Sequence, residues 1–388
     1  MMERTLYNIQ QDPARTPAAW LAADPRQLGG EAAGVGWLDP RRLGEVPALP
    51  EAVRSTLPGQ GVTGVNIRHP RWKRALEFVT PRPGKKRVHL LAVGDVGGIL
   101  LTALKLEGGG TISTIGIHDL NEKAVARWVM EMGQIASCPT HYGDLPEVEA
   151  VSPQQLFDCD VFVFAATRAI PPVGSGVKDV RMAQLEANRP LAEAFARQAR
   201  AADFRGLFAV LSDPVDPLCQ AVWRASNLGP DGELDHLGLL PEQVQGFGLG
   251  VMSARAAYFA KGDPRFASFF TEGRAFGPHG QGLVIANSIR HYDDALSREL
   301  TQLTLEANLR VRDLGFKPYV APAISSGALQ LLLTLRGEWH CSSVPLGGVW
   351  FGCRNRFTPY GLSLETLELP DALFARLRET ERALRDIS

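Results

Sequence analysis

Residues 91–98, LAVGDVGG, join an apolar run to a helix-like segment and have the small residues that a diphosphate-binding turn needs. Gly94 would let the backbone approach a pyrophosphate, and Gly97 would let the helix pack closely on the strand. The helix N-terminus would present free N–H groups and a positive dipole end to the phosphates. Ala92 stands where the usual pattern has its first glycine, so an ordinary strand-to-helix turn is the alternative. The residues expected to contact a dinucleotide here are Gly94, Asp95, Val96 and Gly97.

Asp119 is an acid at the place where a dinucleotide-binding fold contacts the ribose. It ends a second predicted strand, roughly 25 residues after Gly94. A carboxylate there would accept hydrogen bonds from the ribose hydroxyls of NAD and repel a 2′-phosphate. The alternative is that Asp119 only caps the helix that begins near Asn121. The order of strand, glycine turn, helix, strand and acid predicts NAD as the cofactor.

Strands that alternate with helices position these residues. Such alternation predicts βαβ units and a parallel sheet. We therefore expect an α/β protein with a Rossmann-type doubly wound parallel sheet, followed by an α+β substrate domain. The strands are expected at 88–93, 111–119, 161–167, 207–212 and 244–249, with hairpin strands in 344–353. The helices are expected at 96–107, 121–132, 181–202, 252–260, 292–315, 321–336 and 370–385.

Three parts of the chain are distinguished by their patterns. Residues 1–84 are rich in Pro, Gly and Arg and are predicted to form an N-terminal extension. Trp20, Trp37, Leu38 and Trp72 favour an extension that docks on the rest, with a disordered arm as the alternative. Residues 85–216 are predicted to form the NAD-binding domain, and residues 217–388 the substrate or catalytic domain.

The composition excludes several classes of protein. Lys and Arg number 41 against 42 Asp and Glu, which is not the basic excess of a nucleic-acid binder. No apolar run reaches the roughly 18 residues of a membrane span, and the N-terminus has no secretory signal pattern. Five scattered cysteines favour neither disulfides nor a zinc site, and we recognise no metal-ligand cluster. A soluble cytoplasmic protein without nucleic-acid or membrane partners is expected.

Several short motifs follow one another in a characteristic order. DCDVFVFAAT spans 158–167, Arg181 precedes Asn188, SDPVD spans 212–216, SAR spans 253–255 and GPHG spans 277–280. Together with the glycine turn they resemble the lactate/malate dehydrogenase superfamily over about residues 85–385. The resemblance implies an NAD-dependent oxidoreductase that interconverts a small 2-hydroxy acid and a 2-oxo acid. It also implies a small carboxylate substrate and a homo-oligomer, dimer or tetramer.

The resemblance implies a role for each matching residue. His279 looks like the proton-transfer histidine, and a satisfied structural histidine is the alternative. Arg255 looks like the clamp for the substrate carboxylate, where a planar guanidinium binds bidentately; an ion-paired helix-surface arginine is the alternative. Arg181 looks like the arginine that polarises the substrate carbonyl. Asn188 matches a residue near the nicotinamide ribose, with a solvated helix position as the alternative.

The segment 168–180 is predicted to form a lid over the site. It is rich in Pro and Gly and carries Arg181 at its end. It is longer than the loop usual in the superfamily, so Arg168 and Lys178 are only candidates for selecting the substrate.

Two substitutions depart from the superfamily pattern. Met252 stands where the superfamily has the aspartate that orients the histidine, and Asp213 stands where it has asparagine. One hypothesis is that the carboxylate has moved, which predicts Asp213 within hydrogen-bond reach of His279. Slow or altered chemistry, no turnover, and a turn or capping role for Asp213 are the alternatives. Lys317 is also expected near a pocket position where the superfamily often has a small polar residue.

Two other functions fit the residues. An NAD-binding protein with little turnover, such as a redox-state sensor, would explain the lost aspartate. A dehydrogenase of amine or imine substrates would use Asp213 to pair with a cationic nitrogen.

Overall fold

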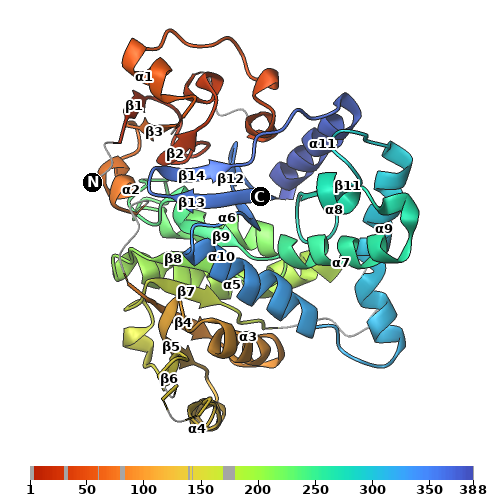
Figure 1. Ribbon diagram of the computed structural model, residues 1–388. Coiled ribbons are helices and arrows are strands. Elements are labelled where there is room, and N and C mark those ends of the chain that lie inside the picture. The colour runs from red at the N-terminus through yellow and green to blue at the C-terminus, as the bar shows by residue number, and fades with distance from the viewer. Residues whose placement is uncertain are drawn as a thin grey trace.

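The computed structural model describes residues 4–29, 34–59, 61–78, 84–138, 140–141, 143–168 and 180–387, with only the backbone at 180–181 (Figure 1). Within these residues no helix is long and apolar enough to cross a membrane.

Six neighbouring parallel strands form one half of a twelve-stranded sheet. Their spatial order is β6-β5-β4-β7-β8-β9, which is the 3-2-1-4-5-6 order of a doubly wound dinucleotide-binding fold. This order confirms the predicted fold class. The six strands are β4 (Lys86–Leu91), β5 (Ile112–His118), β6 (Glu147–Ala150), β7 (Val161–Phe164), β8 (Leu207–Val210) and β9 (Val244–Gly246).

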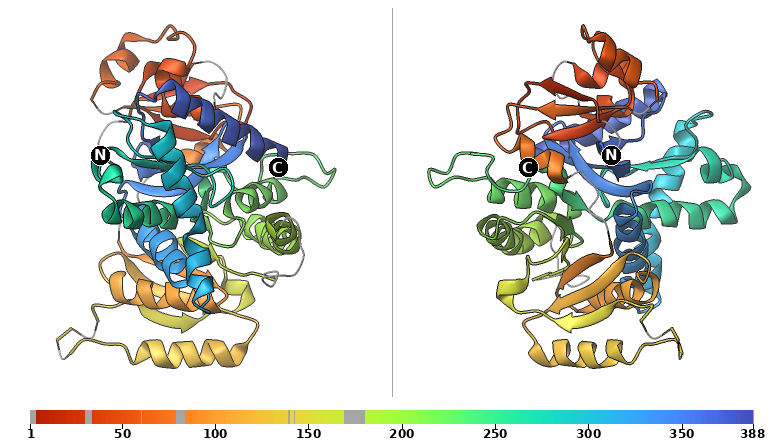
Figure 2. Two further views of the ribbon diagram at one scale, coloured as in Figure 1. Left: turned by 90° about the vertical axis from the view of Figure 1, so that its right-hand side faces the viewer. Right: turned by 60° about the vertical axis from the view of Figure 1, so that its left-hand side comes forward.

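Helices cover both faces of this parallel half. Strands β7 and β8 are fully buried apolar runs, as strands covered on both faces must be. Helices α5 and α6 pack on one face, and α3, α4 and α10 contribute to the apolar cluster on the other. Figure 2 shows the two helix layers on opposite sides of the sheet. The helices are α3 (Asp95–Glu107), α4 (Glu122–Gly133), α5 (Val180–Ala201), α6 (Val215–Ser226) and α10 (Leu329–Leu335).

The sheet continues past β9 with antiparallel strands from the end of the chain. Strands β12 (His340–Leu346) and β13 (Val349–Thr358) form the expected hairpin, and β14 (Gly361–Leu364) follows. Gly347 and Gly348 make the hairpin turn, with φ of 63° and 95°, a left-handed conformation that favours glycine. The remaining elements of this half are α7 (Leu249–Gly262), α8 (Phe269–Glu272), β10 (Arg274–Phe276), β11 (Val284–Ala286), α9 (Asp294–Asp313) and α11 (Asp371–Ile387).

A π-helix interrupts the long helix expected at 321–336. The segment η7 (Pro322–Ala328) has π-helical bonding and leads directly into α10. Ser326 in η7 accepts a hydrogen bond from Val251 N and donates one to Gly248 O, both at 2.8 Å. Ser326 thus links η7 to the start of α7.

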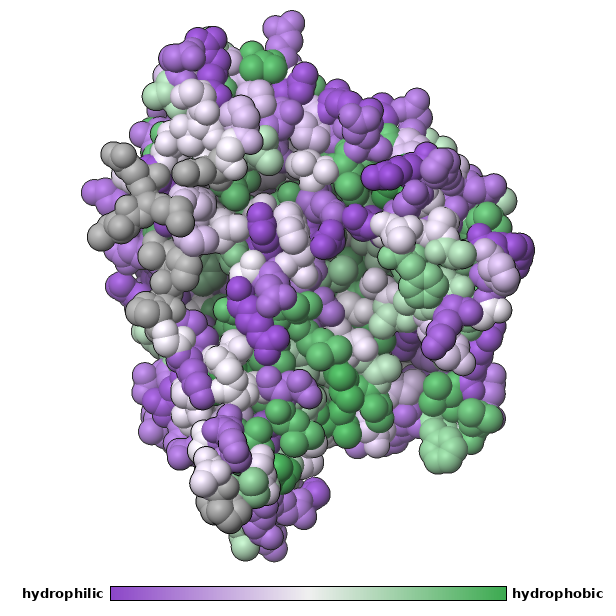
Figure 3. All heavy atoms as spheres, in the orientation of Figure 1, coloured by the Kyte–Doolittle hydropathy of each residue, from purple (hydrophilic) through white to green (hydrophobic). Residues whose placement is uncertain are grey.

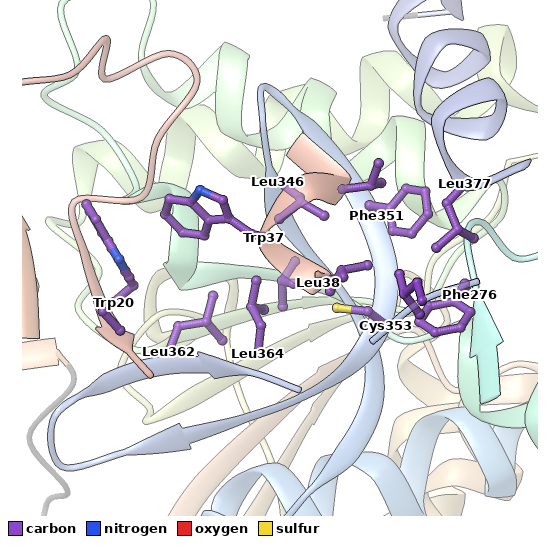
Figure 4. Packing of buried hydrophobic residues seen from close by; sticks show 14 of the residues in the cluster. Trp20, Trp37, Leu38, Phe276, Leu346, Phe351, Cys353, Leu362, Leu364 and Leu377 are labelled. Atoms are coloured by element: carbon purple, nitrogen blue, oxygen red, sulfur yellow. The ribbon is translucent and has the colours of Figure 1, made fainter. Parts of the chain in front are cut away.

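The N-terminal segment completes the other edge of the sheet. Strand β2 (Ala19–Ala22) pairs with β14 and with β3 (Val62–Asn66), and β1 (Leu6–Ile9) pairs with β3. Trp20 and Trp37 are buried, with ring centroids 5.0 Å apart, in a cluster that also includes β13 and β14 (Figure 4). The segment is therefore docked rather than a free arm. One sheet runs through all three predicted parts, and their division at 84 and 216 stays a prediction.

Short helices complete the segment and the connections. The α-helices are α1 (Glu51–Thr56) and α2 (Trp72–Phe78). The 3-10 helices are η1 (Pro25–Leu28), η2 (Gly34–Leu38), η3 (Pro40–Arg42), η4 (Pro153–Gln155), η5 (Pro241–Gln243) and η6 (Pro264–Phe266).

A buried carboxylate joins the N-terminal segment to the parallel half. Glu242 in η5 accepts hydrogen bonds from the backbone N–H groups of Ala18 and Ala19, at 3.0 and 2.9 Å. Burial raises the pKa of Glu242 to about 7, although the two N–H groups favour its ionised form.

Candidate active site

The glycine turn lies between β4 and α3 with its glycines under different constraints. A Cβ at Gly97 would lie 2.0 Å from the carbonyl oxygen of Ala92, so close packing requires glycine there. A Cβ at Gly94 would meet no protein atom within 4 Å. Packing therefore does not explain Gly94, whereas a ligand lying against the backbone would. Ala92 has φ of 73°, so the chain keeps a glycine-like conformation without the glycine.

The carboxylate of Asp119 is held beside this turn. Its Oδ2 accepts from the N–H of Val93 in the turn, and its Oδ1 accepts from the N–H of Asn121, both at 2.9 Å. Asn121, not Asp119, is the N-cap of α4. The carboxylate thus stands at the carboxyl end of β5, where such folds bind ribose.

Lys317 lies at the glycine turn. Its ammonium pairs with Asp95 in the first turn of α3 at 3.0 Å, and this carboxylate raises the pKa of Lys317. The structure thus places Lys317 beside the first turn of α3.

Asn188 in α5 holds two loops together. Its side-chain oxygen accepts from the N–H of Arg168, which follows β7, at 2.9 Å. Its Nδ2 donates to the carbonyl oxygen of Asp213, which follows β8, at 2.8 Å. Asn188 is completely buried, so the solvated helix position considered for it is wrong.

His279 and Asp213 form a hydrogen-bonded pair. The His279 Nδ1 lies 2.9 Å from Asp213 Oδ1, as the relocation hypothesis predicted. Because an ionised carboxylate only accepts hydrogen bonds, Nδ1 carries the shared proton. The His279 side chain is 15% exposed and that of Asp213 is 48% exposed. The pair therefore stands at the wall of the site with its carboxylate half open to solvent.

A second aspartate of the SDPVD motif fixes the backbone of the histidine. Asp216 accepts from the N–H of His279 at 3.0 Å and from the hydroxyl of Ser343 in β12. Burial raises the pKa of Asp216. The contact between Asp216 and the backbone of His279 was not predicted from the sequence. The signal that could have indicated it is a second acid in the SDPVD motif, three residues after Asp213.

Arg255 and Met252 project from one side of α7. The Arg255 Nη1 lies 3.6 Å from the Met252 sulfur, and Met252 is buried in an apolar cluster. No described carboxylate lies within ion-pair distance of Arg255. Burial lowers the pKa of Arg255, whereas the charge of Asp213 acts in the opposite direction. Arg255 is thus a partly desolvated cation in electrostatic reach of the His279–Asp213 pair.

The predicted lid falls mostly outside the described residues. Residues 169–179, with Lys178, are not among them, and Arg181 is described only as a backbone position in the first turn of α5. The N–H of Arg168 is bound to Asn188.

A hollow of about 400 Å³ borders the pair. It is lined by Pro214, Pro278 and Asp216 and by residues of α5 and α11. A larger hollow of about 520 Å³ lies beside the first residues of β4, β7 and β8, at the amino-terminal ends of these strands. Asp213 and His279 are not among the residues that line the first hollow, but their neighbours Pro214 and Pro278 are.

Comparisons with known proteins agree with the fold. No family model matches the chain. It is 27% identical over 195 residues to an L-lactate dehydrogenase of Staphylococcus saprophyticus and 26% identical over 198 residues to one of Mycoplasma genitalium. A lactate dehydrogenase from a Medee basin deep-sea metagenome library has the same fold, with a TM-score of 0.62 at 17% identity. The chain is thus similar in sequence to lactate dehydrogenases and has the fold of the lactate and malate dehydrogenases.

The extent of the likeness differs between sequence and structure. The sequence matches span about half of the chain and 54% and 57% of the two relatives' lengths. The structural match with the metagenomic lactate dehydrogenase covers 78% of this chain and 98% of the dehydrogenase chain. A malate dehydrogenase of Archaeoglobus fulgidus, solved in complex with NADH, has a TM-score of 0.60 at 16% identity, with 78% of this chain and 98% of that chain covered. The superfamily fold is thus nearly complete in this chain.

Proposed function

We propose that this protein is an NAD-dependent oxidoreductase that interconverts a small 2-hydroxy acid and the corresponding 2-oxo acid. The observation that carries the proposal is the His279–Asp213 hydrogen bond in electrostatic reach of Arg255, a partly buried guanidinium without a described carboxylate partner. A proton-transfer group and a carboxylate-binding cation are the two groups that this reaction requires beside the cofactor.

The residues at the glycine turn fit NAD. Gly94 is open on the side of its missing Cβ, and the carboxylate of Asp119 is fixed beside the turn. We propose that Gly94, Asp95, Val96, Gly97 and Asp119 hold the dinucleotide, with Lys317 offsetting the charge of Asp95 near its phosphates. When bound, the nicotinamide supplies or accepts the hydride. The shared fold of a malate dehydrogenase solved with NADH supports this assignment.

His279 moves the proton in this proposal. The imidazolium donates its Nε2 proton to the substrate carbonyl oxygen during reduction and regains it during oxidation. Asp213 holds Nδ1–H and stabilises the positive ring, because a nearby opposite charge favours the charged form. Asn188 holds Asp213 in place by a hydrogen bond to its backbone carbonyl, and Asp216 holds His279 by accepting a hydrogen bond from its backbone N–H. The carboxylate thus reaches the histidine from the loop after β8 instead of from α7.

Arg255 binds the substrate carboxylate in this proposal. A guanidinium matches a carboxylate with two parallel hydrogen bonds, and partial burial strengthens the interaction. We also propose that Arg181 polarises the substrate carbonyl and that a lid at 168–180 carries it over the site.

A homo-oligomer is part of the proposal. Figure 3 shows apolar side chains gathered over the region that Figure 1 assigns to α10. Leu329, the first residue of α10, is exposed, and so are Phe316 and Val320 earlier in the chain. Exposed apolar surface that is continuous favours association, here with a second copy of the chain.

A substrate panel with NADH absorbance as readout tests the proposed function. We expect oxidation of NADH with one or more 2-oxo acids of differing side-chain size and charge, and no need for ammonia. NADH binding without turnover of any panel member would favour a redox sensor. Turnover only when ammonia accompanies the 2-oxo acid would favour an amine or imine dehydrogenase, for which the half-exposed carboxylate of Asp213 is the supporting observation.

A further inference from the structure

We propose that a basic hollow between α11 and the N-terminal segment binds a small polyanion with two or more phosphate or carboxylate groups. The hollow has a volume of about 400 Å³. Five arginines line it, with Glu381 as the one acidic side chain among its described lining residues: Arg15, Arg42, Arg378, Arg382 and Arg385. None of the residues assigned above to the cofactor or to proton transfer lines this basic hollow.

Three segments far apart in the sequence build the basic hollow. Arg15 precedes β2, Arg42 ends η3, and the other arginines lie on α11. Arg378, Arg382 and Arg385 are spaced at i, i+4 and i+7 and therefore share one face of the helix. Like charges at i and i+4 destabilise a helix, so this spacing is unfavourable unless a counter-charge is present.

Two of the arginines already have acidic partners. Arg385 pairs with Glu381, and Glu381 also accepts from the N–H of Val35 at 3.2 Å. Arg42 pairs with Asp39 and Asp371. These contacts order the wall of the basic hollow, and the carboxylate of Glu381 is already bonded to Arg385 and Val35.

The other three arginines have no such partner in the described part of the chain. Among the described residues, no carboxylate lies within ion-pair distance of Arg15, Arg378 or Arg382. All three side chains are exposed. Three guanidinium groups without a carboxylate partner in the described part of the chain surround one small space, which favours a ligand with several negative charges rather than one.

The wall is preorganised by contacts that do not depend on a ligand. The Arg385 Nη2 donates to the carbonyl oxygen of Gly347 in the hairpin turn at 2.9 Å. The Arg42 guanidinium lies 5.0 Å from the ring centroid of Phe374. A site whose walls are already ordered loses less entropy on binding, which favours affinity.

The size and chemistry of the basic hollow define the ligand class. Its volume lies within the range of small-molecule sites. The guanidinium fork binds phosphate and carboxylate groups bidentately. A compact anion such as a diphosphate or a tricarboxylate is therefore the expected ligand.

Calorimetric titration of the full chain tests this site. The probes are inorganic pyrophosphate and citrate, with sulfate at matched ionic strength as the reference, and each titration is repeated with NADH present. The proteins are the wild type, Arg378→Gln with Arg382→Gln, and Arg224→Gln as a control. Arg224 is an exposed arginine on α6, away from the basic hollow.

We expect one bound pyrophosphate or citrate per wild-type chain, and pyrophosphate and citrate separate the two ligand chemistries. The double variant should bind at least roughly 10-fold more weakly, and Arg224→Gln should bind like the wild type. NADH should not displace the probe. Equal affinity in all three proteins, no binding above sulfate, or binding that NADH removes and the double variant retains would overturn the proposal.

Discussion

The Nδ1 of His279 lies 2.9 Å from Oδ1 of Asp213, 66 residues earlier in the chain. The superfamily pattern has an aspartate on the helix that carries Arg255, at the position where this chain has Met252. Met252 is buried in an apolar cluster and touches Arg255 instead. The carboxylate that contacts the histidine therefore comes from the loop after β8.

Replacement of Asp119 by alanine should change the cofactor preference. The carboxylate stands beside the glycine turn and would repel a 2′-phosphate. We expect Asp119→Ala to bind NADH more weakly and NADPH more tightly, as measured by fluorescence titration of both cofactors. Glu122→Ala, at an exposed acid in the first turn of α4, should change neither affinity. Tighter NADPH binding by the wild type would show that Asp119 has another role.

Replacement of Arg255 should weaken substrate binding. Removing one partner of a buried hydrogen-bonded charge pair typically costs about 2–5 kcal/mol. Arg255→Ala should therefore raise KM for the 2-oxo acid by roughly 30-fold or more, with the NADH dissociation constant unchanged. Arg255→Lys should restore little of this loss, because an ammonium cannot form the bidentate contact. The control is Lys261→Ala on the same helix; an unchanged KM in Arg255→Ala would place the arginine outside the site.

Asn188 should affect both stability and turnover. Asn188→Ala leaves the N–H of Arg168 and the carbonyl of Asp213 without their buried partner. We expect a loss of roughly 1–3 kcal/mol in the free energy of unfolding, measured by chemical denaturation. Because the loop of Asp213 loses its support, kcat should fall more than the NADH affinity. If Asn188→Ala unfolds with the same free energy as the wild type, Asn188 does not stabilise the loops that contain Arg168 and Asp213.

The sequence alone predicts the parallel half of the fold well, because strands buried on both faces are continuous apolar runs. The run at 88–93 corresponds to β4 (Lys86–Leu91), and the helix expected at 181–202 corresponds to α5 (Val180–Ala201). Strands such as β6, with the sequence EVEA, have no such run and were missed. The strands of the N-terminal segment were also missed, because β2 pairs with β14 from the end of the chain and β1 and β3 join the sheet only through β2.

The site was predictable where two changes in the sequence explain each other. The acid lost at 252 and the acid gained at 213 together predicted the contact with His279. The role of Asn188 was not predictable, because its two partners follow different strands and meet only in the folded chain. Lys317 was expected near a pocket position; its ion pair with Asp95, more than 200 residues earlier in the chain, could not be predicted from the sequence.

Glu242 should make the stability depend on pH. Burial raises the pKa of its carboxyl group to about 7 in the folded protein, so folding favours the protonated form. Its stabilising contribution is complete at acidic pH, below the usual pKa of glutamate, and is lost as the pH rises through about 7. Between pH 5 and pH 8 the wild type should lose roughly 2–3 kcal/mol of unfolding free energy relative to Glu242→Gln. Parallel stability curves for the two proteins in chemical denaturation would contradict this assignment.

The most direct test of the relocated carboxylate is kcat for reduction against pH in three proteins: the wild type, Asp213→Asn, and Asp213→Asn combined with Met252→Asp. Asp213→Asn restores the residue usual in the superfamily but removes the carboxylate from His279, so the imidazolium is less stabilised. We expect the single variant to lose kcat by roughly 10-fold or more and to retain activity only at lower pH. The double variant should recover both kcat and the wild-type profile. Asp213→Asn with the activity and pH profile of the wild type would contradict the account.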